Sequence, residues 1–173
     1  MGELLYEQRM RLKYNLYACR TAYKRLENAI KENDNHEIYA AIGELLLWVM
    51  TTHEWYKKHG NPNYLQRLKE DSHGVFLFGL SHAYNSLKHN MKLFILHNKE
   101  DGFSFNNIDF NNFDFRPYKL FWVTSVNILD EGFENQRRNY EKYIEGKDVP
   151  DTFNSALIFL NQEAQSILFD KGR

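Results

Sequence analysis

The chain has 173 residues, a net charge of −1 and a hydrophobic fraction of 43%, which predict one globular domain spanning residues 1–173. The near-neutral charge excludes a global field that would attract nucleic acid or anionic membranes. A single cysteine, Cys19, excludes a disulfide framework and a cysteine-based metal site, and its apolar neighbours at helical spacing predict a small core residue. Because the chain has no secretory pattern and no apolar run near about 18 residues, we expect a cytoplasmic protein that does not span a membrane.

The first helix is expected from Glu3 to about Lys31. Apolar side chains at spacings of three, four and seven form one stripe along it: Leu5, Leu12, Leu16, Cys19, Tyr23, Leu26 and Ile30. The same stretch is basic with few acids, and its cations are Arg9, Arg11, Lys13, Arg20, Lys24 and Arg25. This pattern fits a local binding patch or a solvated helix face, and the solvated face is the simpler interpretation.

A polar turn at residues 32–35 precedes the second helix, in which Asp34 or Asn35 can serve as the N-cap. This helix is expected from about His36 to Lys58. Its main apolar face consists of Ile38, Ile42, Leu45, Val49, Thr52 and Tyr56. Trp48 and Trp55 lie on a second face, so the helix is expected to be buried on two sides, as at the centre of a bundle or at a dimer seam.

The remaining elements are separated by turn-forming residues. In chain order they are a loop or short helix at 63–71, a helix at Ser72–His97, an Asn- and Phe-rich loop at 98–118 that its Phe side chains pin to the bundle, an extended run at Lys119–Leu129, and helices at Gly132–Ile144 and Asp151–Phe169. This order predicts an all-α bundle of about five helices, with one long aromatic-rich loop and at most one short extended segment.

The third helix carries the most informative polar residues. His82, Asn85, Ser86 and His89 fall within an arc of about 100°, opposite the apolar stripe of the same helix. Histidine can move protons near neutral pH, and Asn85 and His89, four residues apart, can meet on the helix surface. The band therefore predicts either a site or a solvated face. His82 and His89 are seven residues apart, about 10.5 Å along the axis, so no metal site is expected.

The segment Gly79–Asn90 resembles the helix of HEPN-superfamily proteins that carries Arg, then four to six residues, then His. Many members have Arg-Asn-x-x-x-His, whereas this chain has Tyr84, Asn85 and His89 at the three positions. Further segments, Arg116–Val123 and Tyr140–Phe159, resemble the tail of an uncharacterised bacterial group of HEPN-like proteins. The likeness extends over residues 36 to 165.

The resemblance implies a helical bundle, commonly dimeric, in which the helices that carry Arg and His meet at the dimer interface. It implies that active members are metal-independent RNases, often of toxin–antitoxin or phage-defence systems, and that members without the motif bind partners. In such an RNase, His removes the proton of a ribose 2′-hydroxyl, and Arg stabilises the charge that develops on the phosphoryl oxygens.

This chain departs from the family pattern at the charged position. Tyr84 cannot supply a permanent positive charge, and its helical phase points it towards the apolar side. Lys88 lies about 100° around the helix from His89. A second loose match, Arg67 followed six residues later by His73, is of the kind expected by chance and falls in a predicted loop.

The missing arginine favours a degenerate HEPN-like protein that associates with RNA or binds a partner, as a homodimer and without a cofactor. One alternative is an active RNase in which His89 is the base, Asn85 positions the phosphate, and Lys88 or a partner subunit supplies charge. The other alternative is a purely structural or regulatory interaction protein. His82, Ser86 and Lys88 are the predicted binding residues in either RNA-linked case.

Overall fold

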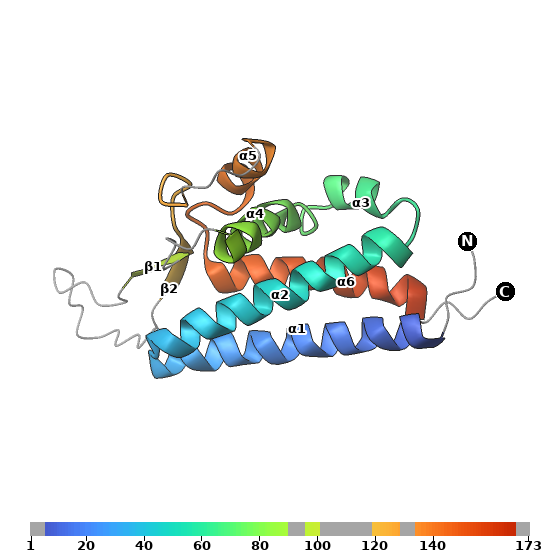
Figure 1. The fold of residues 1–173 in the computed structure, drawn as a ribbon, viewed down its shortest axis with the longest axis horizontal. Coiled ribbons are helices and arrows are strands. Elements are labelled where there is room, and N and C mark those ends of the chain that lie inside the picture. The colour runs from blue at the N-terminus through green and yellow to red at the C-terminus, as the bar shows by residue number, and fades with distance from the viewer. Residues whose placement is uncertain (1–5, 90–95, 101–118, 129–133, 169–173) are drawn as a thin grey trace, which may run out of the picture.

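A computed structural model describes residues 6–89, 96–100, 119–128 and 134–168. In these ranges the helices are α1 (Tyr6–Glu32), α2 (Asn35–His59), α3 (Tyr64–Glu70), α4 (Phe76–His89), α5 (Glu134–Tyr143) and α6 (Val149–Leu168), and the strands are β1 (His97–Glu100) and β2 (Lys119–Trp122). The all-α prediction is confirmed (Figure 1). None of the helices in the described ranges has the length and apolar composition needed to cross a bilayer.

A tight turn joins α1 and α2 into an antiparallel hairpin. Asn33 takes a left-handed conformation with φ of 56°. Asp34 is the N-cap of α2, since its carboxylate accepts from the backbone N–H groups of His36 at 2.9 Å and Glu37 at 3.1 Å. The predicted cap is therefore confirmed, and the chain reverses direction within a few residues.

The helix α2 lies at the centre of the bundle, packed against α1, α4 and α6. Its Leu45 and Leu46 are fully buried, and Trp55 is buried while Trp48 is half-buried against the core. The expected burial of this helix on two sides is confirmed.

Cys19 of α1 is also buried, as predicted, and burial raises the pKa of its thiol to about 11.

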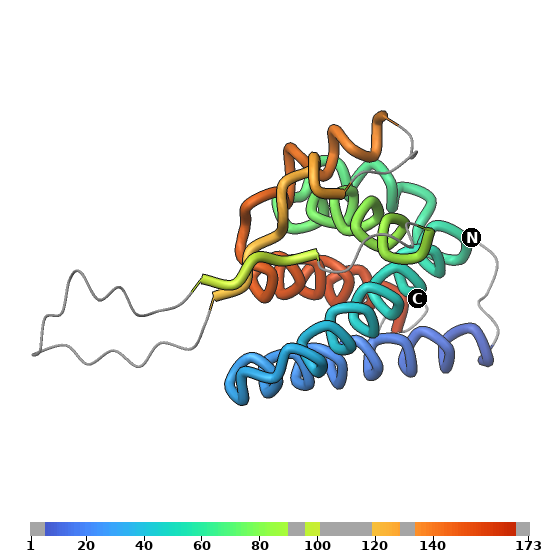
Figure 2. The backbone as a smooth tube through the Cα atoms, turned by 60° about the vertical axis from the view of Figure 1, so that its left-hand side comes forward, coloured from blue at the N-terminus to red at the C-terminus, as the bar shows by residue number. Residues whose placement is uncertain are grey.

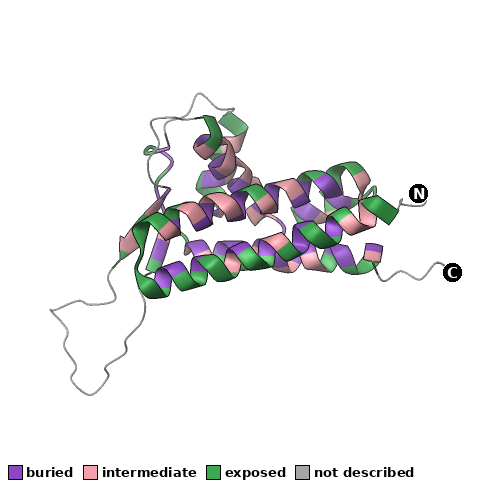
Figure 3. Ribbon diagram, turned by 60° about the horizontal axis from the view of Figure 1, so that its bottom comes forward, coloured by how far each residue is buried: buried purple, intermediate pink, exposed green. Residues whose placement is uncertain are grey.

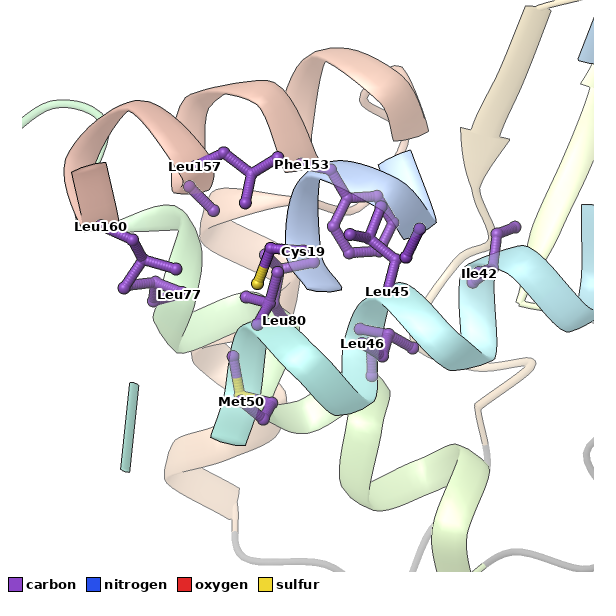
Figure 4. Close-up of a cluster of buried hydrophobic side chains, with 14 of the residues drawn as sticks. Cys19, Ile42, Leu45, Leu46, Met50, Leu77, Leu80, Phe153, Leu157 and Leu160 are labelled. Carbon is purple, nitrogen blue, oxygen red and sulfur yellow. The ribbon is translucent and has the colours of Figure 1, made fainter. Parts of the chain in front are cut away.

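Apolar side chains from four helices meet in one core, shown in part in Figure 4. The labelled members are Cys19, Ile42, Leu45, Leu46, Met50, Leu77, Leu80, Phe153, Leu157 and Leu160. They come from α1, α2, α4 and α6, so helices distant in the sequence depend on one another for burial. Hydrophobic burial of this kind is the main favourable term in folding.

A short antiparallel ribbon closes one end of the bundle beside α6 (Figure 2). The register of β1 and β2 runs from His97 opposite Trp122 to Glu100 opposite Lys119. The extended segment is confirmed over residues 119–122. The predicted end of the third helix at His97 is wrong, because His97 begins a strand and pairs with Trp122, 25 residues later in the chain.

Side-chain spacing along a helix could not reveal a strand partner so distant in the chain.

The ribbon also anchors the Trp122 side chain, which is buried against Tyr140 and Phe153. The short helix α3 realises one of the two forms expected for residues 63–71. The loop predicted for residues 98–118 is wrong at 98–100, which belong to β1, and its Phe residues fall in 101–118, outside the described residues, as does their predicted packing.

A buried series of hydrogen bonds and stacked rings links α2, α3 and α6. His53 Nδ1 lies 2.7 Å from the hydroxyl of Tyr64, the Tyr64 ring stacks on Tyr56 at 5.3 Å, and the Tyr56 hydroxyl donates to the backbone oxygen of Leu160 at 2.7 Å. Burial lowers the pKa of His53 to about 4. His53 is therefore neutral at pH 7, and its Nδ1 can accept the Tyr64 proton.

We predict that acid destabilises the protein through His53. Its pKa is 6.5 unfolded and about 4 folded, so the unfolded chain binds the extra proton and stability is lost as pH falls from 6.5 towards 4. The shift corresponds to about 3 kcal/mol. Urea unfolding at several pH values should show a flatter pH dependence for His53→Asn than for wild type.

His36→Asn is the matched control, because His36 is fully exposed at the start of α2. This variant should keep the wild-type pH dependence of the unfolding free energy. Equal slopes of unfolding free energy against pH for wild type and His53→Asn between pH 4 and 6.5 would contradict the assignment of the acid sensitivity to His53.

Candidate functional site

The polar residues of α4 do not form the continuous exposed band that their spacing predicts. His82 is 1% exposed and Ser86 is fully buried, whereas Lys88 and His89 are exposed at the end of the helix. The solvated band is therefore wrong for His82 and Ser86. The physical reason is that α5 packs on this side of α4, so the helix is covered on two faces (Figure 1).

Small residues allow this close packing. A Cβ atom at Gly79 would lie 2.8 Å from Cγ2 of Ile144, well inside contact distance. His82, three residues after Gly79, meets the Tyr140 ring edge-on with ring centroids 5.6 Å apart. Gly79 and His82 thus lie on the face of α4 that receives α5 and the turn after it, and the buried Ser86 shares this face by helical phase.

Asn85 and Tyr84 also have structural contacts. The Asn85 amide donates to the side-chain oxygen of Gln136 on α5 at 3.0 Å. Tyr84 is half-buried against the core, as its helical phase predicts, and the Lys88 ammonium lies 6.0 Å from the centre of its ring. Asn85 is therefore bound to α5, and position 84, where the resemblance would place Arg, holds an aromatic ring packed against the core.

The second loose match to the family motif, Arg67 with His73, does not form a pair either. Arg67 forms a two-bond ion pair with Glu163 of α6, in which Nε donates to Oε1 at 3.0 Å and Nη2 donates to Oε2. Glu163 is 6% exposed, so Arg67 compensates a buried carboxylate. The structure therefore gives Arg67 a structural role and leaves it no pairing with His73.

No group of three or more His, Cys, Asp or Glu side chains within the described ranges is arranged to hold a metal ion. Among the same residues, an open groove lies between α1 and α6, which lie side by side (Figure 3). Two adjoining hollows of about 650 Å³ and about 450 Å³ form it, and both are lined by Arg20, Asn161 and Gln165. We call this feature the α1–α6 groove.

The two walls of the α1–α6 groove differ in chemistry. The α1 wall carries Lys13, Arg20 and Lys24, spaced by seven and four residues, with Tyr14 and Tyr17 among them. The α6 wall is uncharged and rich in amides: Asn154, Asn161, Gln162 and Gln165. Leu16, Leu157 and Ala164 are buried beneath the groove. One carboxylate, Glu27, lines the groove, at its far end.

The cations of the groove differ from their neighbour Arg25. Arg25 is neutralised by Glu37 and Glu44, each 2.9 Å away on α2. Within the described part of the chain, no ion pair involves any of the three groove cations, which are spread along the exposed face of α1. The groove therefore has a local positive charge although the whole chain is nearly neutral.

Sequence reasoning identified the basic stretch of α1 but did not find the groove. The amides at 154, 161 and 165 repeat the seven-and-four spacing of the groove cations, and this signal was available in the sequence. What the sequence did not contain was the antiparallel pairing of α1 with α6, which places the two polar rows on opposite sides of one groove.

Neither protein-family models, nor curated proteins, nor solved structures match this chain. The resemblance to HEPN proteins therefore depends on the short sequence segments alone.

We predict that Gly79→Ala lowers the free energy of unfolding by about 1 kcal/mol. Overpacking against Ile144 should cost about 1–3 kcal/mol and the better helix former should return about 1 kcal/mol. Gly43→Ala on α2 is the control, because its new Cβ would meet only the flexible end of Leu87 at 3.4 Å and should stabilise. Chemical denaturation measures both.

A double variant separates the cost of overpacking at Gly79→Ala from the gain in helix propensity. In an Ile144→Ala background the Gly79→Ala change should lose most of its cost, because the two closest atoms, Cγ2 and Cγ1 of Ile144, are gone and only its Cβ, at 3.3 Å, remains. Equal effects of Gly79→Ala in both backgrounds would contradict the close approach of α4 and Ile144.

Proposed function

We propose that this protein is a non-catalytic, HEPN-like module that associates with RNA. The observation that carries the proposal is the packing of Tyr84, the residue at the family's arginine position, against the core. A tyrosine there leaves the 2′-hydroxyl chemistry without the permanent positive charge that stabilises the phosphoryl oxygens.

The other members of the expected site support the same conclusion. His89 is exposed and can accept a proton, but the neighbouring Asn85 amide is bound to Gln136. His82 and Ser86, which would extend a binding surface, are buried under α5. A base alone leaves the developing phosphoryl charge unstabilised, so RNA cleavage by one protomer is not favoured.

Association with RNA is supported by the unneutralised cations of α1, since phosphate neutralisation supplies most of the affinity for nucleic acids. The proposal includes a cytoplasmic homodimer of a toxin–antitoxin or phage-defence system, as the family resemblance implies. The active-RNase alternative requires Lys88 or a partner subunit to bring charge to His89, and it predicts RNA cleavage that depends on His89.

We expect that wild-type protein does not cleave a mixed RNA pool in EDTA, because the charged half of the catalytic pair is missing. Denaturing gel electrophoresis of the RNA after incubation with protein measures this. His89→Ala should behave identically to wild type. His36→Ala, prepared in the same way, controls for contaminating nucleases, because His36 lies exposed on α2.

Cleavage by wild type and by His36→Ala that disappears in His89→Ala would overturn the proposal in favour of the active RNase. Absence of any RNA binding would overturn it in favour of a structural or regulatory interaction protein.

A further inference from the structure

We infer that the α1–α6 groove binds single-stranded RNA, with phosphates along the cations of α1 and bases against its exposed tyrosines. This inference rests on the proposed association with RNA and assigns it to a surface separate from α4. The groove is lined by side chains of α1 and α6 alone, whereas the residues that resemble the HEPN motif lie on α4.

The charge along the groove suits a phosphate backbone. Lys13, Arg20 and Lys24 lie in one row, because spacings of seven and four residues return to the same helix face. The positive section from Met10 to Lys24 is about 21 Å long by the helical rise. That length accommodates about four to six nucleotides of a single strand.

Aromatic side chains stand beside the cations. Tyr14 is 65% exposed and Tyr17 is 64% exposed, although apolar rings of this size favour burial. Both lie in the hollow that Lys13 and Arg20 also line. Interleaved cations and flat rings are the usual components of single-strand sites, in which bases stack on the rings without sequence preference.

The α6 wall favours RNA over an apolar protein segment. Asn154, Gln162 and Gln165 are exposed, and amides of this kind can donate to and accept from ribose 2′-hydroxyls and base edges. An apolar helix laid in the groove would bury these amides and the three cations without partners, at a large desolvation cost.

A second copy of the chain fits less well. A two-fold interface through this groove would enclose the three cations of both copies in one contact, with Glu27 as the one lining carboxylate that each copy offers to neutralise them. At the Glu27 end carboxylates offset the positive charge: burial is the main cause that raises the pKa of Tyr23 there, and the carboxylates of Glu27, Asp151 and Asp148 raise it further. The strand is therefore expected to occupy the section between Met10 and Lys24.

The test is fluorescence anisotropy of an unstructured, labelled RNA of about 12 nucleotides at several salt concentrations. The groove variant is Lys13→Gln/Arg20→Gln/Lys24→Gln. The matched control, Arg11→Gln/Lys58→Gln/Lys69→Gln, removes the same charges from exposed positions outside the groove. Because all six side chains are exposed, we expect both variants to fold, which circular dichroism melting verifies.

The groove variant should bind at least about tenfold more weakly than wild type near 50 mM salt. Its slope of log affinity against log salt should be shallower by about 2, since each of three lost phosphate contacts contributes about 0.7. The control should stay within about twofold of wild type.

Tyr14→Ala/Tyr17→Ala should weaken binding at least about fivefold without changing the salt slope, because stacking carries no charge. Tyr6→Ala/Tyr39→Ala is its control, since both rings are exposed and neither lines the groove.

Equal weakening in the groove variant and its control would overturn the groove assignment while leaving association with RNA intact. A DNA strand of the same sequence that binds as tightly as the RNA would overturn the choice of RNA. Self-association of wild type that the groove variant loses, measured by sedimentation, would identify the groove as an interface between copies and overturn the inference. Cleavage that depends on His89 would instead overturn the proposed function alone.

Discussion

Burial of α2 from several sides is the constraint on which the rest of the bundle depends. Its apolar residues extend around most of the helix, so α1, α4 and α6 must all pack against it. Leu45 and Leu46, adjacent in sequence and therefore about 100° apart around the helix, are both fully buried, so the core covers more than one side of α2. With α2 enclosed in this way, α1 is left as an outer helix with one stripe in the core and one face to solvent, and that face forms a wall of the α1–α6 groove.

The second consequence concerns α4, which is enclosed by α2 and α6 on one side and by α5 on the other. Polar residues in the middle of such a helix must be compatible with burial. Gly79 permits the approach of Ile144, His82 meets the ring of Tyr140, and Asn85 bonds to Gln136. Residues that resemble a catalytic motif in the sequence thus act largely as packing and orienting groups in this protein.

The distribution of charged side chains over the surface explains how a nearly neutral chain has a positively charged groove. Acidic side chains neutralise cations elsewhere, as Glu37 and Glu44 do for Arg25 and as Glu163 does for Arg67. Along Lys13, Arg20 and Lys24 the facing helix offers amides instead of carboxylates. Net charge reports the sum over the surface, whereas binding responds to the local field within about one Debye length.

The sequence by itself determined the helical class, most helix positions, the Asp34 cap, the burial of Cys19 and the two-sided burial of the second helix, because periodicity and capping are local properties. It also indicated that Tyr84 points towards the core. Only the tertiary structure decided that His97 belongs to a strand, that His82 and Ser86 are covered by α5, and that α6 faces the basic row of α1. These outcomes depend on which distant segment covers a given face, and a polar residue has the same helical phase whether water or another helix lies against it.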